Sequence, residues 1–185
     1  WRHERPVRLT TRGGTMARVA YADSNNPETR PLVERIQRER SGLPNLYKML
    51  LNSPPVAEGW LNYLTAIRQK SSLPPRLREL LILRVAVLNE ADYEFEQHLP
   101  IALQAGCDER QVEGVKAGDF TALDGAERAA MAYCDEMTRA IRVRDATFAA
   151  VRQAYDDKAI VEITATIAAY NMVSRFLEAI QVDHE

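Results

Sequence analysis

Residues 79–98 read E-L-L-I-L-R-V-A-V-L-N-E-A-D-Y-E-F-E-Q-H, an almost unbroken apolar segment followed by an acidic turn and a second segment. Nearly every position from 80 to 88 except Arg84 is apolar, which predicts a central helix covered on most of its sides. Glu94 and His98 lie four residues apart, on one face of the next predicted helix. The sequence therefore predicts that the chemistry of the chain lies in this helical hairpin.

The rest of the chain also has helical patterns. Apolar positions at helical spacing, with Pro, Ser or Asp near the starts of segments and Gly after two of them, indicate where helices begin and end. The predicted helices cover residues 27–40, 44–51, 54–70, 76–88, 91–105, 108–117, 124–141, 145–154 and 157–182. Pro100 is expected to bend the helix just after His98. No segment shows a convincing strand pattern, so we expect an all-α bundle of eight to nine helices.

Composition is typical of a soluble protein with one domain. The 185 residues include 46% hydrophobic and 27% charged residues, and no apolar run approaches the roughly 20 residues that span a bilayer. Two cysteines at unrelated positions agree with a reducing compartment. We therefore expect a cytoplasmic protein that does not interact with membranes.

The first fifteen residues differ in charge from the remainder. They contain four arginines and one glutamate and precede Met16, which resembles a natural start, so we expect residues 1–15 to be an extension and residues 16–185 to form the domain. Without them the counts fall from 24 basic and 26 acidic residues to 20 and 25. The domain is then acidic overall, which argues against nucleic acid as a partner.

The hairpin resembles the carboxymuconolactone decarboxylase and alkyl hydroperoxidase D (AhpD-like) superfamily, whose motif is a glutamate, then C-x-x-C, then a histidine. On this motif the glutamate falls on Glu79, the two cysteine positions fall on Ala91 and Glu94, and the histidine falls on His98. The Y-E-F-x-x-H pattern from Tyr93 is similar to a cysteine-free branch of the superfamily that is often labelled decarboxylase-like. The resemblance supports an AhpD-like helical bundle, and we expect this bundle to form an oligomer.

The resemblance implies a role for Glu79 and His98, and their place in the sequence beside this pair suggests roles for Glu94 and Tyr93. Glu79 would donate or accept a proton facing His98, and its alternatives are a favourable first-turn acid or a surface pair with Arg76 or Arg78. Glu94 is expected to hydrogen-bond His98 and set its tautomer, or else to belong to a solvated acidic face. Tyr93 is expected to place a hydroxyl in the pocket, or to be an ordinary core aromatic.

Two arginines are candidates to bind a substrate carboxylate. Arg175 belongs to the N-M-V-S-R-F stretch of the last predicted helix, and a similar ending occurs in larger members of the superfamily; its alternative is an ion pair with Glu178 or a neighbouring subunit. Arg84 is likewise a candidate to bind a substrate carboxylate, and its alternatives are an ion pair with another residue or neutralisation of Glu79. Zinc signatures and glycine-rich nucleotide loops are absent from the sequence, so we expect no metal and no cofactor.

These residues predict acid–base chemistry on a small organic acid or lactone, in the manner of a decarboxylase. One alternative is the peroxidase branch, which needs a reactive thiolate and a resolving cysteine. Cys107 and Cys134 lie on different predicted helices without C-x-x-C spacing, so we expect both to be structural. The other alternative is a non-catalytic oligomeric binding module. Apolar residues on several faces of the last helix favour self-association in each case.

Overall fold

The regular structure of residues 17–185, which the computed structural model describes, consists of helices without a strand. The helices are α1 Arg30–Arg40, α2 Asn45–Leu50, α3 Pro54–Thr65, the π-helical turn η1 Ala66–Lys70, α4 Pro75–Leu88, α5 Asp92–Gln104, α6 Glu109–Ala117, α7 Gly125–Ala140, α8 Asp145–Ala154 and α9 Asp157–Ile180. The all-α prediction is confirmed, and the helices start and end within a few residues of their predicted limits.

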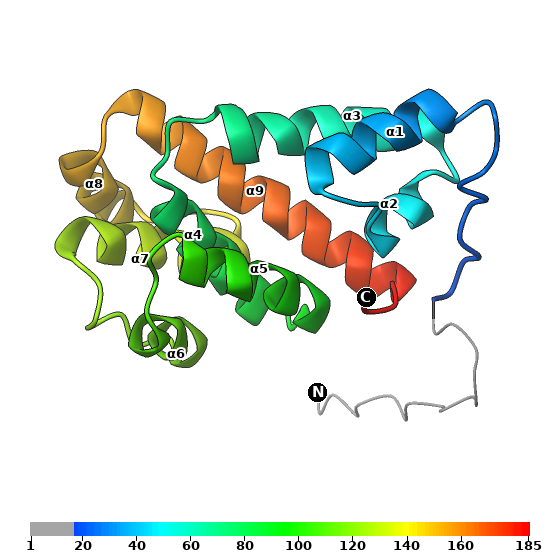
Figure 1. The fold of residues 1–185 in the computed structure, drawn as a ribbon. Coiled ribbons are helices and arrows are strands. Elements are labelled where there is room, and N and C mark those ends of the chain that lie inside the picture. The colour runs from blue at the N-terminus through cyan, green and yellow to red at the C-terminus, as the bar shows by residue number, and fades with distance from the viewer. Residues whose placement is uncertain (1–16) are drawn as a thin grey trace.

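Helix α4 lies at the centre of the bundle, as its apolar sequence predicts. Its residues from 79 to 86 are all buried, and α5, α6, α7 and α9 pack around it. Figure 1 shows α9 running diagonally through the molecule, with α1 to α3 along one side and α4 to α6 along the other. Any charged side chain of α4 in this stretch is therefore surrounded by protein.

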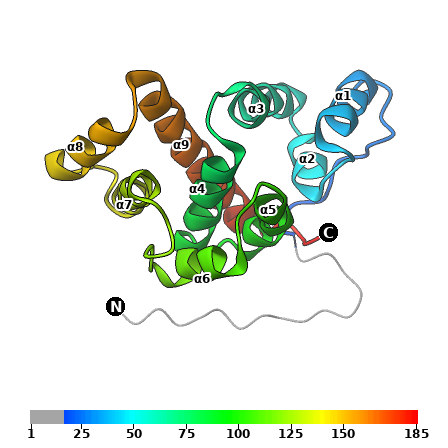
Figure 2. The same cartoon turned by 60° about the vertical axis from the view of Figure 1, so that its left-hand side comes forward.

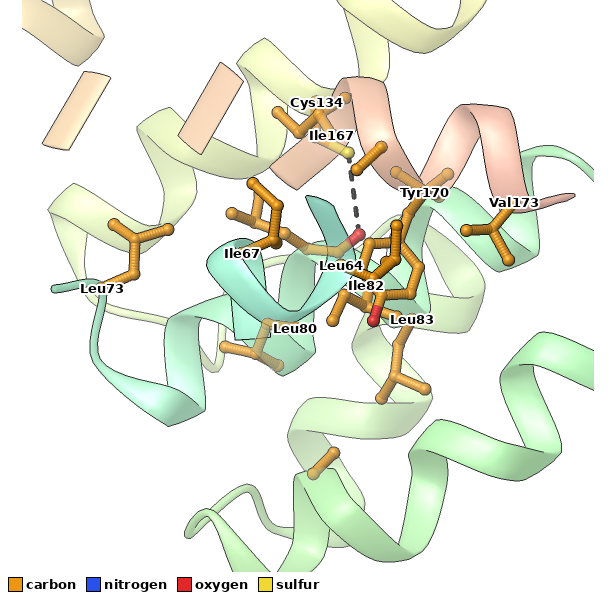
Figure 3. Close-up of a cluster of buried hydrophobic side chains, with 14 of the residues drawn as sticks. Leu64, Ile67, Leu73, Leu80, Ile82, Leu83, Cys134, Ile167, Tyr170 and Val173 are labelled. Atoms are coloured by element: carbon orange, nitrogen blue, oxygen red, sulfur yellow. Dashed lines mark hydrogen bonds between the residues drawn. The ribbon is translucent and has the colours of Figure 1, made fainter. Parts of the chain in front are cut away.

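The two ends of the bundle are formed by different parts of the chain. Helices α7 and α8 lie at one end and α1 and α2 at the other, with α4, α5 and α9 between them (Figure 2). The core between α4 and α9 contains large buried side chains, including Leu83, Ile167 and Tyr170 (Figure 3). This packing fixes α5 against α4 and α9, the three helices that carry the candidate site.

Aspartates define the starts of three helices by capping them. Asp108 and Asp124 accept hydrogen bonds from the backbone N–H groups three residues later, and both form complete capping boxes. Asp156 caps α9 through the N–H of Ala159, at 2.7 Å. Helix α5 continues through Pro100, with His98 in its middle.

The third helix ends in a wider turn that its sequence does not reveal. Residues Ala66–Lys70 form a π-helical turn that continues α3 without a break. π-Helical turns occur mostly as single turns and often near functional sites. This one packs against α9.

Two further sequence predictions concern the first fifteen residues and membrane-spanning helices. The predicted extension at residues 1–15 lies outside the described residues. Among residues 17–185, no helix combines the length and the apolar character that crossing a bilayer requires.

Candidate active site

Glu79 of α4 and His98 of α5 meet in the interior. The Glu79 side chain is fully buried, the His98 side chain keeps 9% exposure, and Glu79 Oε2 lies 2.7 Å from His98 Nδ1. The apolar residues of α4 place the carboxylate inside the bundle, and α5 packs alongside it. The structure thus brings together the acid and the imidazole that the sequence singled out.

Arg78 also reaches Glu79. Its Nε–H donates to Glu79 Oε1 at 3.1 Å, so one carboxylate accepts from both a guanidinium and an imidazole. Burial by itself would raise the pKa of Glu79, but the hydrogen bonds and charges of His98 and Arg78 outweigh it and lower the pKa. Glu79 is therefore ionised at neutral pH, and the alternative partner Arg78 belongs to the same buried arrangement.

His98 is held in one orientation by two neighbours. Burial lowers its pKa, against the opposing effect of Glu79, so the neutral imidazole is favoured. The carboxylate of Glu79 selects the tautomer with hydrogen on Nδ1, which leaves the lone pair on Nε2. The ring of Tyr170 packs edge-to-face against the imidazole, with centroids 5.0 Å apart. Nε2 is therefore the atom available for proton transfer.

Glu94 does not orient His98, contrary to the sequence prediction. It is 2% exposed, which also excludes the solvated acidic face, and its Oε2 is hydrogen-bonded to Ser174 Oγ of α9. Glu94 Oε1 is buried and has no hydrogen-bond partner among residues 17–185. Glu79 takes the orienting role because its helix faces Nδ1, whereas Glu94 points toward α9.

Burial favours the neutral form of Glu94 because its hydrogen bonding is poor. Ser174 Oγ lies 2.8 Å from the carbonyl oxygen of Tyr170 and also meets Glu94 Oε2, but a hydroxyl has only one hydrogen. That hydrogen is divided between Glu94 Oε2 and the Tyr170 carbonyl, so Ser174 compensates the buried carboxyl group only weakly. In agreement, burial raises the pKa of Glu94 from 4.5 to about 8, despite the hydrogen bond to Ser174. Glu94 is thus mainly neutral at pH 7.

Tyr93 faces the C-terminal segment. Its hydroxyl donates to Glu185 Oε1 at 2.7 Å, and its ring packs edge-to-face on His184 with centroids 5.6 Å apart. Burial and the neighbouring Glu185 raise the pKa of Tyr93. The side chain is buried and its hydroxyl is engaged by Glu185, so the predicted pocket hydroxyl is instead an aromatic contact that ties α5 to the end of the chain.

Arg84 neither neutralises Glu79 nor presents a free guanidinium, which corrects both of those predictions. Its Nε and Nη2 donate to the two carboxylate oxygens of Asp135 at 2.6 and 2.7 Å, and its Nη1 donates to the carbonyl of Val115 at 2.7 Å. This bidentate pair joins α4 to α7 and α6. The guanidinium has no free edge with which to bind a substrate.

Arg175 lies on the exposed side of α9. Its Nη1 donates to the backbone oxygen of Asn171 at 3.0 Å and to the side-chain oxygen of the same residue. Asn171 in turn donates to Thr138. The structure therefore does not bring Arg175 together with Glu79 and His98.

Sequence reasoning missed two side chains of the site. Tyr170 and Ser174 lie four residues apart on α9 and face His98 and Glu94 respectively. The available signal was their spacing: a tyrosine and a serine on one face of a long, mostly apolar helix. Both belong to the stretch Y-N-M-V-S-R-F, of which only Arg175 was predicted to take part in the site.

Both cysteines are free and buried. Burial raises the pKa of Cys107 to about 11 and that of Cys134 to about 12, so neither thiol forms a thiolate readily at neutral pH. Figure 3 shows Cys134 within the core, where its sulfur lies 4.0 Å from the carbonyl oxygen of Leu81. These surroundings are those of structural cysteines.

The Glu79–His98 pair is distinct from the surface depression at the start of α9. Within residues 17–185, no three His, Cys, Asp or Glu side chains are grouped so as to hold a metal ion. A surface depression lies at the start of α9, lined by Arg152, Tyr155, Asp156, Asp157 and Lys158. Tyr170 is 13 residues further along α9 than Asp157, or about 20 Å at 1.5 Å per residue, so this depression is separate from the site.

The chain matches a known family over the segment that carries this site. Residues 54–136, from α3 to most of α7, match the Carboxymuconolactone decarboxylase family. The matched segment contains Glu79, Glu94 and His98. No curated protein sequence matches the chain significantly.

Solved structures share the fold at low sequence identity. An uncharacterized peroxidase-related protein from Silicibacter sp. TM1040 is 20% identical, with a TM-score of 0.80 over 92% of each chain. The alkylhydroperoxidase AhpD core of an uncharacterized peroxidase-related protein from Ralstonia eutropha JMP134 is 17% identical, with a TM-score of 0.80 over 93% of this chain and 94% of that one. The debrominase Bmp8, in complex with 2,3,4-tribromopyrrole, is 19% identical, with a TM-score of 0.78 over 93% of this chain and 94% of that one.

The chain is an all-helical protein with a glutamate and a histidine at facing positions of a central hairpin. Its segment 54–136 matches the Carboxymuconolactone decarboxylase family, and its fold is that of the AhpD-like solved structures. Its own sequence has Ala91 and Glu94 at the two positions that the superfamily motif fills with cysteine.

Proposed function

We propose that this protein is an acid–base enzyme, resembling a decarboxylase, that acts on a small organic acid or lactone. The observation that carries the proposal is the 2.7 Å hydrogen bond between Glu79 and His98 inside the bundle, which directs the lone pair of Nε2 away from the carboxylate. A histidine held in this way can take up and return a proton near neutral pH. The family match supports lyase chemistry of this kind.

His98 would transfer the proton, and Glu79 would position it and stabilise its charge. When a substrate loses carbon dioxide, the carbon–carbon bond breaks and its electron pair stays on the remaining carbon as carbanion or enolate character. His98, which is neutral at rest, has by then taken up a proton from solvent at Nε2, and this Nε2–H is donated to that carbon. The adjacent Glu79 carboxylate stabilises the imidazolium while it exists. Neutral His98 is regenerated when the proton has been transferred.

Substitutions of the pair test the proposal. We expect His98→Gln to lower kcat for decarboxylation by about 10²- to 10⁴-fold, the usual contribution of a positioned acid or base. Glu79→Gln keeps the shape but removes the charge, so we expect a smaller loss. Carbon dioxide release and deuterium incorporation from solvent, measured over a panel of small lactones and oxo acids, follow the reaction directly.

The matched control is His184→Gln, because His184 is an exposed histidine bonded to Glu96. It should leave the rate unchanged. If wild type and His98→Gln release carbon dioxide and exchange deuterium equally, the acid–base assignment is wrong, and the non-catalytic binding module becomes the better explanation of the fold.

The peroxidase alternative draws support from the names of the structural relatives, two of which are described as peroxidase-related. The residues of this chain argue against it. Neither Ala91 nor Glu94 can attack a peroxide or form a disulfide. Burial raises the pKa of Cys107 and of Cys134, so no activated thiol replaces the missing pair. We therefore favour the acid–base function.

A further inference from the structure

The π-helical turn Ala66–Lys70 carries an arginine toward the side of the bundle where the site lies. The turn packs against α9, the helix that holds Tyr170 over His98. Ile67 of the turn and Tyr170 belong to the same buried cluster (Figure 3). Arg68 follows Ile67 directly and is half-buried.

Arg68 differs from the other arginines near the core because its guanidinium is unpaired. It makes no hydrogen bond or ion pair with any of residues 17–185, whereas Arg84 is fully occupied by Asp135 and Val115. Partial burial of a charged group without a partner is unfavourable. Such a group is retained at a cost, which points to an anion that is bound from outside the chain.

The charges of Arg68 and Arg78 both act on the site. Burial lowers the pKa of His98, and the two arginines lower it further. Burial raises the pKa of Tyr170, and the same two arginines oppose that change. Arg78 gives its Nε–H to Glu79, and Arg68 has no acceptor among the described residues.

The balance of charge around His98 and Tyr170 is therefore positive. The charges of two guanidinium groups act on this region, against one ionised carboxylate, that of Glu79, because the pKa of Glu94 is raised to about 8 and this carboxyl group is mainly neutral at pH 7. The excess is one positive charge. A ligand with a single negative charge would neutralise it.

We infer that Arg68, on the π-helical turn, binds the carboxylate of a small monoanionic substrate beside Nε2 of His98. This inference rests on the proposed function and names the anchor that Arg84 and Arg175 do not provide. A guanidinium offers two parallel N–H donors to a carboxylate, which fixes the orientation of the substrate as well as its position. The reacting carbon is then held near the imidazole.

Direct binding measurements test the anchor without the need for turnover. Benzoate and propionate are titrated into wild type, Arg68→Gln and Arg68→Lys by calorimetry, with benzamide and propionamide as uncharged counterparts. We expect both carboxylates to bind wild type and to bind Arg68→Gln about tenfold more weakly or worse, with Arg68→Lys in between. The amides should not bind.

The control variant is Lys70→Gln, which removes an exposed positive charge from the same turn. It should bind the carboxylates as wild type does. Labelled His98 should show a shift of its Nε2 resonance on addition of benzoate in wild type and not in Arg68→Gln. Circular dichroism confirms that each variant is folded.

The inference is overturned if neither carboxylate binds wild type, if Arg68→Gln binds them with wild-type affinity, or if the amides bind equally well. The proposed function is tested separately, by measuring turnover in His98→Gln. Carboxylate binding that depends on Arg68, combined with full turnover in His98→Gln, would support the anchor while contradicting the acid–base role of His98.

Discussion

Glu79 and Glu94 are both buried carboxyl groups, but their neighbours move their pKa values in opposite directions. Glu79 accepts hydrogen bonds from His98 and Arg78, which lower its pKa despite burial. Glu94 meets only a serine hydroxyl, so burial dominates and raises its pKa to about 8. Two groups of the same type thus supply one charged and one neutral side chain at pH 7.

The raised pKa of Glu94 predicts a pH dependence of stability. Between its ordinary pKa of 4.5 and about 8, folded Glu94 keeps a proton that the unfolded chain releases, so the free energy of unfolding falls as pH rises through this window. Glu94→Gln cannot titrate. Relative to wild type, the variant should therefore gain stability as pH rises from 4.5 to about 8, by at most ~1.4 kcal/mol per pH unit.

Urea unfolding at a series of pH values measures this difference. Glu96→Gln is the control, because Glu96 is an exposed glutamate on the same helix, bonded to His184. Its stability should follow the wild-type curve. A Glu94→Gln variant whose stability runs parallel to wild type over the whole range would show that Glu94 is ionised in the folded protein.

At the residue scale, the sequence predicted the pair but not the surroundings that decide its chemistry. Glu79 and His98 could be found because both belong to one motif within 20 residues. The partners of Glu94 could not, because Ser174 lies 80 positions further along the chain and only the packing of α9 on α5 brings it there. The same holds for Tyr170, which covers His98 from α9.

At the scale of helices, the sequence predicted most boundaries because local side chains set them. Asp108, Asp124 and Asp156 cap the helices that follow, and this signal is readable without a structure. The π-helical turn at residues 66–70 was predicted as ordinary helix. Its sequence, A-I-R-Q-K, has good helical propensity, and only tertiary packing distinguishes the two forms.

The ion pair between Arg84 and Asp135 links α4 to α7 and should contribute strongly to stability. Arg84→Ala leaves the mostly buried carboxylate of Asp135 and the carbonyl of Val115 without their donor. We expect the free energy of unfolding to fall by about 3 kcal/mol, the lower end for a broken buried pair, because Asp135 is 20% exposed.

Arg139→Ala is the matched control for this prediction. Arg139 pairs with the same Asp135, at 3.6 Å, but its side chain is 64% exposed. Its removal should cost less than about 1 kcal/mol. Equal losses of stability in the two variants, measured by urea unfolding, would mean that the Arg84–Asp135 pair contributes no more than the exposed Arg139–Asp135 pair.

At the scale of the whole molecule, several large apolar side chains remain uncovered. Ile141 is 84% exposed at the end of α7, and Val161 is 66% exposed on α9. Uncovered apolar groups favour association between copies of a chain. We therefore keep the prediction of a homo-oligomer.

Light scattering measures the mass in solution, which should be a multiple of that of one 185-residue chain. Val161→Lys should shift the population toward smaller species, because it places charge on an apolar surface. The control is Val19→Lys, since Val19 is also exposed, at 42%, but precedes the first helix. A single-chain mass for wild type at all concentrations would rule out self-association.

The π-helical turn makes the geometry of the site sensitive to chain length. Deleting one residue between Ala66 and Lys70 would let the segment close as an ordinary α-helix, in which each residue turns by about 100°. Arg68 would then swing to a different face, while Glu79 and His98, on α4 and α5, would keep their places. A shortened protein should therefore separate anion capture from proton transfer, so that each could be studied alone.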